Sequence, residues 1–342
     1  MNMIIIINRE PIVIPMSVLC SGSFVADIMI PNLPHLGPPG SLTYAPNGIK
    51  LSPGGHSANV AIDLAQLGLK SVHAVGSIGN DMMGGFMVDQ LVSRGVKVHA
   101  ERQESTTAKN VALLVKGEDR RFIAELTANS MLTASFLLDA IELVSPRVFY
   151  QGTLGGLPDI ENNIANVLAR AHQKGALTFI DVIMPTNGWD YLEEAYPHLE
   201  IFHCNIQEGT ALTGLSDPEA MIDYLMEKGI KLALISDGGN GVTAGIDDLQ
   251  VFMPAFSVTH EDATGTGDAL CAGIINTIMG KGVELDQIHD PDLLIDLLLA
   301  GQATGAACVT GVGATTNVRP DIIDGIMGGR ELVLSNTVVT RK

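Results

Sequence analysis

Short apolar runs alternate with longer amphipathic segments over much of the chain after residue 140. An apolar run of four to six residues reads as a buried strand, and apolar residues three and four apart read as one face of a helix. Strands separated by helices favour a parallel sheet that is covered on both faces, so the pattern predicts an α/β fold. The strand-like runs are 147–150, 177–181, 201–204 and 231–236, and the helix-like segments are 160–173, 208–212 and 218–228.

The first 130 residues combine the same pattern with a second kind of segment. Residues 17–24 predict a first core strand, and two helices at 57–67 and 81–94 flank a strand at 72–75. Five prolines between residues 28 and 51 exclude a helix there and favour irregular or edge-strand structure. A strand-rich block follows at 98–126. Proline content alone fits a surface loop as well as a small sheet.

Composition narrows the classes of ligand. The 342 residues are 46% hydrophobic and include 37 glycines, enough for one large α/β domain with a smaller unit, or for two domains. The net charge of −18 argues against nucleic-acid partners and against anionic membranes, which require basic surfaces. An anionic ligand would therefore have to be held by backbone N–H groups, a metal ion and a few selected cations.

Cysteines and the N-terminal residues suggest where the protein works. Cys20, Cys204, Cys271 and Cys308 are far apart and form no C-x-x-C pair, which predicts buried, reduced thiols in a cytoplasmic protein. The apolar opening of residues 1–15 is interrupted by polar residues and is too short to span a bilayer. We interpret it as an N-terminal extension, and we expect no membrane span elsewhere.

The loop at residues 262–268 carries the clearest chemistry. Gly265 and Gly267 lack a Cβ, and the apolar helix expected at 269–279 begins directly after them. Backbone N–H groups at a helix N-terminus suit a phosphate. Asp268 would lie beside that anion, where it could take a proton from an attacking hydroxyl. A tight turn with an Asp that interacts favourably with the helix dipole is the structural alternative. Leu270, in place of a third glycine, disfavours a dinucleotide fingerprint.

Two motifs in this order resemble those of the ribokinase-like (PfkB) family of carbohydrate kinases. Residues 262–268 read D-A-T-G-T-G-D and are similar to the family signature D-T-x-G-A-G-D, with Ala263 and Thr266 as small-residue departures. Residues 54–59, Gly-Gly-His-Ser-Ala-Asn, resemble the glycine pair with a following Asn. The resemblance covers roughly residues 17–327.

The resemblance implies a three-layer α/β/α fold with a mainly parallel central sheet and a small β-sheet lid. We expect one domain at 16–330, with lid segments at about 27–52 and 97–126, an extension at 1–15 and a tail at 331–342. Lid strands often pair between subunits in this family, so a homodimer through the lid is a further expectation.

The same resemblance assigns residues to an acceptor site. Asp27 would bind a vicinal diol of the acceptor, Gly54 and Gly55 would let it approach the backbone, and Asn59 and Asn129 would also face it. A capping or turn Asp at position 27, and N-capping of the helix by Ser57, are the structural alternatives.

The resemblance also implies candidate residues for the nucleotide and for metal ions in the second half of the chain. Asn205 and Glu208 match an N-x-x-E element and would hold Mg²⁺ largely through water, unless they only cap a helix. Backbone oxygens of Asp262 and Thr264 are candidates for a monovalent cation such as K⁺. The loop of Ser236, Gly238 and Gly241 resembles a nucleotide loop and also fits a hairpin turn, and Thr264 and Asn205 complete the nucleotide contacts. Asp181 ends another strand, and its role stays open.

The sequence thus predicts an ATP-dependent, Mg²⁺-requiring kinase for a hydroxyl, expected to be primary, of a sugar or small polyol. Asp268 would be the general base, and the N–H groups of Gly265, Thr266 and Gly267 would form the anion hole. A nucleoside kinase on the same scaffold and a non-catalytic sugar-binding relative are the alternatives.

Overall fold

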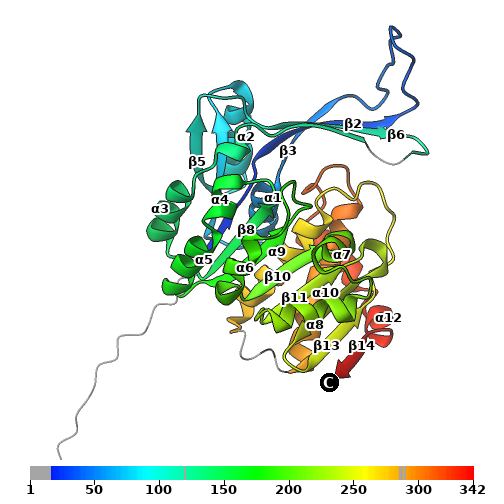
Figure 1. Ribbon diagram of the computed structural model, residues 1–342. Coiled ribbons are helices and arrows are strands. Elements are labelled where there is room, and N and C mark those ends of the chain that lie inside the picture. Colours follow the sequence, from blue (N-terminus) through cyan, green and yellow to red (C-terminus); the bar gives the residue numbers. More distant parts are fainter. Residues whose placement is uncertain (1–16, 119–120, 285–287, 289) are drawn as a thin grey trace, which may run out of the picture.

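A large sheet forms the centre of the computed structural model, which describes residues 17–118, 121–284, 288 and 290–342 (Figure 1). Its strand order is β14-β13-β12-β11-β10-β9-β8-β1-β4-β5. The pairs from β5 through β11 are parallel, and β12, β13 and β14 are added antiparallel. The strands are β1 (Val18–Ser21), β4 (Val72–Gly79), β5 (Lys97–Gln103), β8 (Val148–Leu154), β9 (Leu177–Val182), β10 (Ile201–Asn205), β11 (Leu232–Ser236), β12 (Val242–Ile246), β13 (Leu249–Met253) and β14 (Val338–Arg341).

Helices cover both faces of this sheet, which confirms the predicted three-layer fold (Figure 1). Side chains alternate along each strand, so Val18 and Cys20 join one core cluster and Leu19 joins the other. One face carries α1 (His56–Gln66), α2 (Met82–Ser93), α9 (Thr266–Lys281), α10 (Pro291–Val309) and α11 (Pro320–Met327). The other carries α3 (Ala134–Val144), α5 (Ile164–Gln173), α6 (Tyr191–Ala195), α7 (Ile206–Thr213) and α8 (Pro218–Glu227).

A second sheet projects from the main body as a lid (Figure 1). It has four strands in the order β3-β2-β6-β7, formed by β2 (Val25–Leu33), β3 (Lys50–Gly54), β6 (Lys109–Val115) and β7 (Arg121–Glu125). We call these strands the lid sheet. The predicted small β-sheet is therefore present, and the proline-rich residues between β2 and β3 form its long connecting loop.

Two boundaries differ from those expected. Residues 97–103 were assigned to the lid, but they form β5 of the large sheet, because Val98 and Ala100 pack against its core. The expected tail at 331–342 has regular secondary structure. Its first residues belong to α12 (Arg330–Ser335), and its last residues form β14, which pairs with β13. Residues 1–15 lie outside the described residues.

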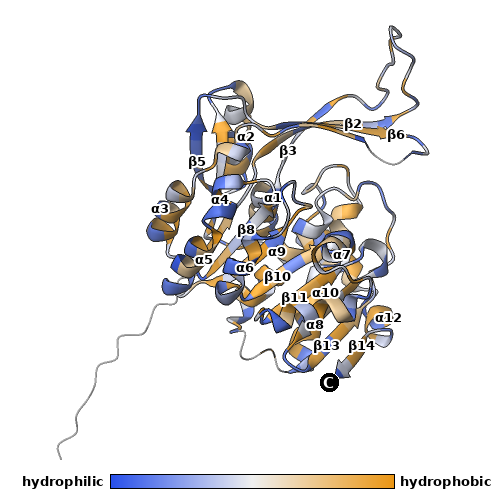
Figure 2. Ribbon diagram, viewed as in Figure 1, coloured by the Kyte–Doolittle hydropathy of each residue, from blue (hydrophilic) through white to orange (hydrophobic). Residues whose placement is uncertain are grey.

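Helix α10 has the length and apolar character of a membrane span, although we expected no such span from the sequence. In the structure, 67% of its most apolar window is buried within the protein. It packs against α9 and against β13 on one face of the sheet, and Figure 2 shows apolar ribbon concentrated in these inner layers. The apolar composition of α10 is therefore explained by its place in the core.

The contact between α9 and α10 depends on Gly273. A Cβ at this position would lie 2.6 Å from Thr304 Oγ1 and 2.7 Å from the Ala300 carbonyl oxygen. We expect Gly273→Ala to lower the free energy of unfolding by about 1–3 kcal/mol through overpacking. Gly280, in the same helix, has open space around its Cβ position, so Gly280→Ala should stabilise by about 0.5–1 kcal/mol. Urea denaturation of both variants measures this, and equal effects would contradict the close packing at Gly273.

Candidate active site

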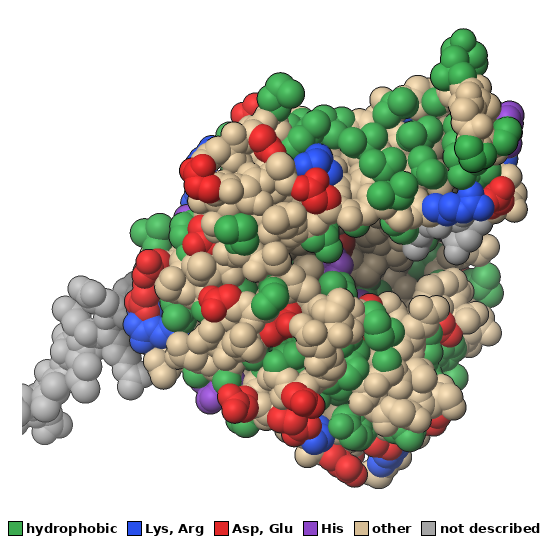
Figure 3. All heavy atoms as spheres, turned by 45° about the horizontal axis from the view of Figure 1, so that its top comes forward, with side chains coloured by type: hydrophobic (Ala, Val, Ile, Leu, Met, Phe, Trp, Pro, Cys, Tyr) green, Lys and Arg blue, Asp and Glu red, His purple; other side chains and the backbone are tan. Residues whose placement is uncertain are grey.

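One cavity of about 590 Å³ brings most of the predicted donor-side residues together. It opens beneath the lid sheet, at the carboxyl ends of β9, β10 and β11 and the N-terminus of α9, and Figure 3 shows the hollow between the lid and the main body. Phe122, from β7 of the lid sheet, contributes to its wall. The predicted residues that line it are Asn205, Glu208, Ser236, Gly238, Gly241, Thr264, Gly265, Thr266, Gly267 and Asp268.

The N-terminus of α9 has the form expected of an anion site. Its N-cap, Gly265, has φ 81°, and no side chain caps the first N–H groups of the helix. A Cβ at Gly265 would lie 2.5 Å from Ala314 Cβ, so both the backbone angle and the packing require glycine. A Cβ at Gly267 would lie 3.3 Å from His203 Cε1. The helix therefore presents backbone N–H donors and the positive end of its dipole to the cavity.

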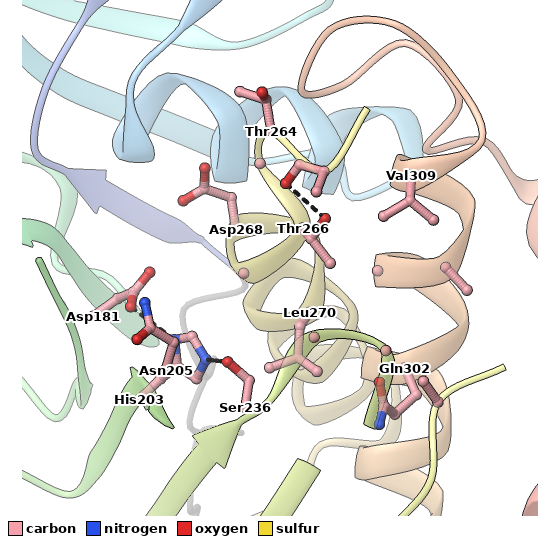
Figure 4. Close-up of a pocket in the computed structure, with 18 of the residues that line it drawn as sticks. Asp181, His203, Asn205, Ser236, Thr264, Thr266, Asp268, Leu270, Gln302 and Val309 are labelled. Atoms are coloured by element: carbon pink, nitrogen blue, oxygen red, sulfur yellow. Dashed lines mark hydrogen bonds and ion pairs between the residues drawn. The ribbon is translucent and has the colours of Figure 1, made fainter. Parts of the chain in front are cut away.

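Asp268 is held at this terminus with one oxygen free. Its side chain points into the cavity in Figure 4, and the residue is 5% exposed. Oδ2 accepts a 2.8 Å hydrogen bond from Asn59 Nδ2, and Oδ1 is buried without a hydrogen-bond partner. Burial raises the pKa of Asp268 to about 6, although the hydrogen bond from Asn59 opposes this rise. A carboxylate with this pKa is ionised near neutral pH and can still accept a proton.

Asp181, His203 and Ser236 form a hydrogen-bonded row across three neighbouring strand ends (Figure 4). His203 Nδ1 lies 2.7 Å from Asp181 Oδ1, and His203 Nε2 lies 3.0 Å from Ser236 Oγ. Asp181 Oδ2 also accepts from the Tyr150 hydroxyl. Burial opposes the charge on Asp181, but its interaction with His203 outweighs that cost and lowers the pKa of the carboxyl. Asp181 therefore holds the ring that orients the Ser236 hydroxyl.

Sequence reasoning missed His203, although a signal for it exists. Alternate residues of a strand share one face, and His203 lies two positions before Asn205 in β10. It also missed His56, which stands inside the second motif and lines the cavity.

Asn205 and Glu208 cap α7. Asn205 Oδ1 accepts from the N–H groups of Gln207 and Glu208, and Glu208 Oε2 accepts from the Asn205 N–H at 2.9 Å. The structural alternative for this pair is thus realised as a capping box. Glu208 nevertheless lines the cavity, and burial raises its pKa. The cap uses one oxygen of the carboxylate, so a hard cation or its hydration water can be bound by the other, and the residue fits Mg²⁺.

The predicted acceptor residues lie at the root of the lid sheet. Asp27 is within β2 instead of following a strand, because this strand continues into the lid. It is 6% exposed and accepts a 3.1 Å hydrogen bond from Asn110 Nδ2. Burial raises the pKa of Asp27 to about 6. A Cβ at Gly54 would lie 2.0 Å from Asp27 Oδ2, so this glycine makes room for the carboxylate.

Unpartnered polar atoms cluster near this root. Asn110 Oδ1 and Asn129 Nδ2 are buried without hydrogen-bond partners, while Asn129 Oδ1 accepts from the Phe24 N–H. Asn59 Oδ1 is likewise buried and unpartnered. Because buried polar groups are normally satisfied, these atoms suit a polyhydroxylated ligand that would complete their hydrogen bonds.

Three other predicted residues have structural explanations. Gly55 has φ 93°, and a Cβ there would lie 2.4 Å from the Ser23 carbonyl oxygen. A Cβ at Gly241 would lie 2.2 Å from the Met253 carbonyl oxygen at the end of β13, so the turn before β12 requires glycine there. Both carboxylate oxygens of Asp262 accept hydrogen bonds, Oδ1 from Thr264 and Oδ2 from the Gly313 N–H.

Comparison with known proteins agrees with this geometry. The model of the family described as "pfkB family carbohydrate kinase" matches residues 16–321. The chain belongs to the pfkB family of carbohydrate kinases. The expected enzyme class, an ATP-dependent carbohydrate kinase, is thereby confirmed.

The similarity of this kinase to known relatives, in sequence and in structure, covers most of the chain. It is 27% identical over 312 residues to a probable fructokinase-7 from Arabidopsis thaliana, which covers 87% of this chain and 88% of the relative. It superposes with a TM-score of 0.77 on a fructokinase from Xylella fastidiosa solved with bound ATP, at 25% identity, covering 93% and 99% of the two chains. A ribokinase from Thermotoga maritima shares the fold, with a TM-score of 0.73, 20% identity and coverage of 91% and 99%.

The buried carboxylate makes a prediction for the stability of this kinase. In the folded state the pKa of Asp268 rises from its ordinary 3.8 to about 6, so folding favours the protonated form. Stability contributed by this group is present below about pH 4 and is lost as the pH rises through about 6, a change of roughly 3 kcal/mol at most. Asp268→Asn should therefore raise the unfolding free energy at pH 7.5 by roughly 1–3 kcal/mol.

Urea denaturation at pH 7.5 and pH 4, without nucleotide, measures this difference. Most of the gain should disappear at pH 4, where the folded-state carboxyl is protonated and the unfolded-state carboxyl, with its ordinary pKa of 3.8, is roughly half protonated. Asp139→Asn, on the exposed surface of α3, is the matched control and should leave stability nearly unchanged. A loss of stability in Asp268→Asn at pH 7.5 would contradict the destabilising burial of this carboxylate.

Proposed function

We propose that this kinase transfers the γ-phosphoryl group of ATP to a hydroxyl, expected to be primary, of a sugar or related small polyol, with Asp268 as the general base. One observation carries the proposal: a buried carboxylate with a free oxygen lies in the first turn of a helix whose first residues have no side-chain cap and line the same cavity. A carboxylate beside an anion site repels the ligand unless it has a chemical task, and removing the proton of the accepting hydroxyl is such a task.

The reaction requires two things of the chain, a proton acceptor and a site for the developing charge. Asp268 Oδ1 receives the proton of the accepting hydroxyl as its oxygen attacks the γ-phosphorus. The bond from that phosphorus to the β,γ-bridging oxygen breaks, and ADP keeps the electron pair. The N–H groups of Gly265, Thr266 and Gly267 stabilise the negative charge on the group in transfer, at a helix terminus that already points toward it.

The donor would lie along the strand ends. Ser236, which is oriented by His203, and the loop at Gly238 would contact the polyphosphate of ATP. Gln302 and Gly305 of α10 would form the wall of the cavity against the adenine ring. Glu208 would hold Mg²⁺, mostly through water, and the ion would offset part of the phosphate charge. The ATP bound to the Xylella fastidiosa fructokinase supports this donor.

The acceptor would lie between Asp268 and the root of the lid sheet. Asp27 offers two oxygens to a diol, and Asn59 connects directly to Asp268. Phe122 reaches the cavity wall from the lid sheet, so movement of this sheet would exclude water, a competing acceptor. The fructokinase relatives make fructose the first acceptor to test.

Three further expectations accompany this proposal. A homodimer through the lid is supported by exposed apolar side chains, of which Leu42 is 74% and Tyr44 78% exposed. A cytoplasmic location is supported by four buried, free cysteines. Activation by K⁺ stays a prediction that rests on main-chain oxygens of Asp262 and Thr264, because the Asp262 carboxylate is already bonded within the protein.

A coupled assay of ADP release over pentoses, hexoses, sugar acids and nucleosides tests the function. We expect acceptor-dependent turnover with at least one sugar, and Asp268→Asn should lower kcat by ~10²–10⁴-fold with little change in nucleotide affinity. Turnover with nucleosides alone would favour the nucleoside kinase. Tight sugar binding without turnover would favour a non-catalytic relative, and near-normal turnover of Asp268→Asn would contradict the assignment of the base.

The metal proposal has its own test. Glu208→Gln keeps an oxygen that can accept the Asn205 N–H and so preserves the helix cap, but it removes the negative charge. We expect the Mg²⁺ concentration for half-maximal activity to rise by ~10–100-fold, with most of kcat recovered at saturating Mg²⁺. An unchanged Mg²⁺ dependence, measured by titration at fixed ATP, would assign Glu208 to the cap alone.

A further inference from the structure

The wall of the cavity is short of positive charge. Asp181, Glu208 and Asp268 bring carboxylates to it, and a nucleotide would add further negative charge. Among the described residues that line the cavity there is no Lys or Arg; the basic side chains are three histidines, His56, His203 and His260. His203 is already bonded to Asp181 and Ser236, so its ring is committed to the donor side.

His56 occupies a different place, next to the base. One side-chain atom each of His56, Asp181 and Asp268 lies within 4.8 Å of the others. His56 is the first residue of α1, and its side chain is 27% exposed where it lines the cavity. Any group that binds to Asp268 from the cavity therefore comes within reach of this imidazole.

Several features of β8 hold the imidazole in one orientation. The pairing of β8 with β9 shifts register between Gln151 and Leu154, and Thr153 within that irregularity has φ 61°. In this left-handed conformation the Thr153 N–H donates a 3.1 Å hydrogen bond to His56 Nδ1. Gly152 makes room for the His56 side chain, because a Cβ there would lie 2.5 Å from His56 Cβ. Such strain and such bulges are costly, and they concentrate at functional sites.

A second hydrogen-bonded link fixes the same pair of segments. Ser23 Oγ lies 2.8 Å from Thr153 Oγ1, and it accepts a 3.3 Å hydrogen bond from the His56 N–H. The ring of His56 is thus bonded to Thr153 directly, and its backbone N–H is connected to Thr153 through Ser23.

The bond at Nδ1 decides the tautomer. A nitrogen that accepts an N–H cannot carry a proton itself, so the neutral imidazole carries its proton on Nε2. Nδ1 is turned to the backbone of β8, and the opposite edge of the ring is left for the cavity. The structure therefore presents a fixed imidazole N–H donor in the wall of the cavity, close to Asp268.

We propose that His56 is a second catalytic residue, whose Nε2–H donates to a non-bridging oxygen of the phosphoryl group as it passes from ATP to the acceptor. The inference rests on the proposed function. In the step described above, charge develops on the group in transfer while the acceptor proton goes to Asp268; the imidazole would strengthen its hydrogen bond as that charge develops and would transfer no proton. In this cavity, whose described lining contains no Lys or Arg, the His56 imidazole would supply the hydrogen-bond donor to the phosphoryl group.

Two substitutions separate this role from a structural one. In His56→Asn the amide oxygen can take the place of Nδ1 and accept the Thr153 N–H, but nothing replaces Nε2. In His56→Gln the longer amide can reach the position of Nε2. We expect His56→Asn to lower kcat by ~10²–10³-fold, the scale for loss of one preorganised donor, with the KM values for ATP and acceptor changed less than about threefold. His56→Gln should retain kcat within about tenfold of the wild type.

A binding measurement supplements the kinetics. ADP with aluminium fluoride and the acceptor mimics the group in transfer, so His56→Asn should weaken this complex by roughly the same factor as kcat while leaving ATP affinity nearly unchanged. His172→Asn, at an imidazole that is 57% exposed on α5, is the histidine control and should match the wild type. Thermal unfolding of each variant checks that the fold is retained.

The outcomes are distinguishable. A wild-type enzyme without acceptor-dependent turnover overturns the proposed function, and this inference with it. If the wild type is active, normal turnover of His56→Asn overturns the inference alone. Equal losses in His56→Asn and His56→Gln with lowered unfolding temperatures assign the ring to anchoring β8. A rise confined to the acceptor KM assigns it to acceptor binding.

Discussion

The site depends on one unfavourable arrangement: a carboxylate buried at the positive end of a helix, next to the place for a polyanion. Asp268 gains from the dipole of α9 and from Asn59, yet burial still raises its pKa to about 6. The protein keeps the cost tolerable by leaving the first N–H groups of α9 without side-chain caps, next to the carboxylate. Stability is lost at this position, as is usual where a carboxyl group with a raised pKa serves a chemical task, and the proposed function gives it that task.

The rest of the fold serves to hold this arrangement. The contact of α9 with α10 depends on the absence of a side chain at Gly273, and α1 packs beside α9 so that Asn59 meets Asp268. The parallel strands β9, β10 and β11 end at the same edge, which brings Asp181, His203 and Ser236 into one row. A displacement of any of these elements by one residue would turn the polar side chains away from the cavity.

Polar groups of the site differ in how far the protein satisfies them. On the donor side, the Asn205–Glu208 cap and the Asp181–His203–Ser236 row are hydrogen-bonded within the chain, so their geometry is fixed before any ligand binds. On the acceptor side, Asn59, Asn110 and Asn129 each keep one buried atom without a partner. Preorganised groups at the predicted donor site and unmet hydrogen bonds at the predicted acceptor site agree with the proposed function, in which ATP is the donor and a particular polyol is the acceptor.

The sequence by itself determined the α/β class, the glycine turn before α9 and the family, because these depend on local patterns: apolar periodicity, residues without a Cβ and two short motifs. It also placed Asn205 and Ser236 at strand ends. The tertiary structure alone decided that residues 97–103 join the large sheet and that Asp27 lies inside a strand of the lid sheet. Strand pairing is set by packing between distant segments, which no local pattern encodes. The same holds for His56 and His203, whose positions follow from an irregularity in β8 and from the alignment of three strands.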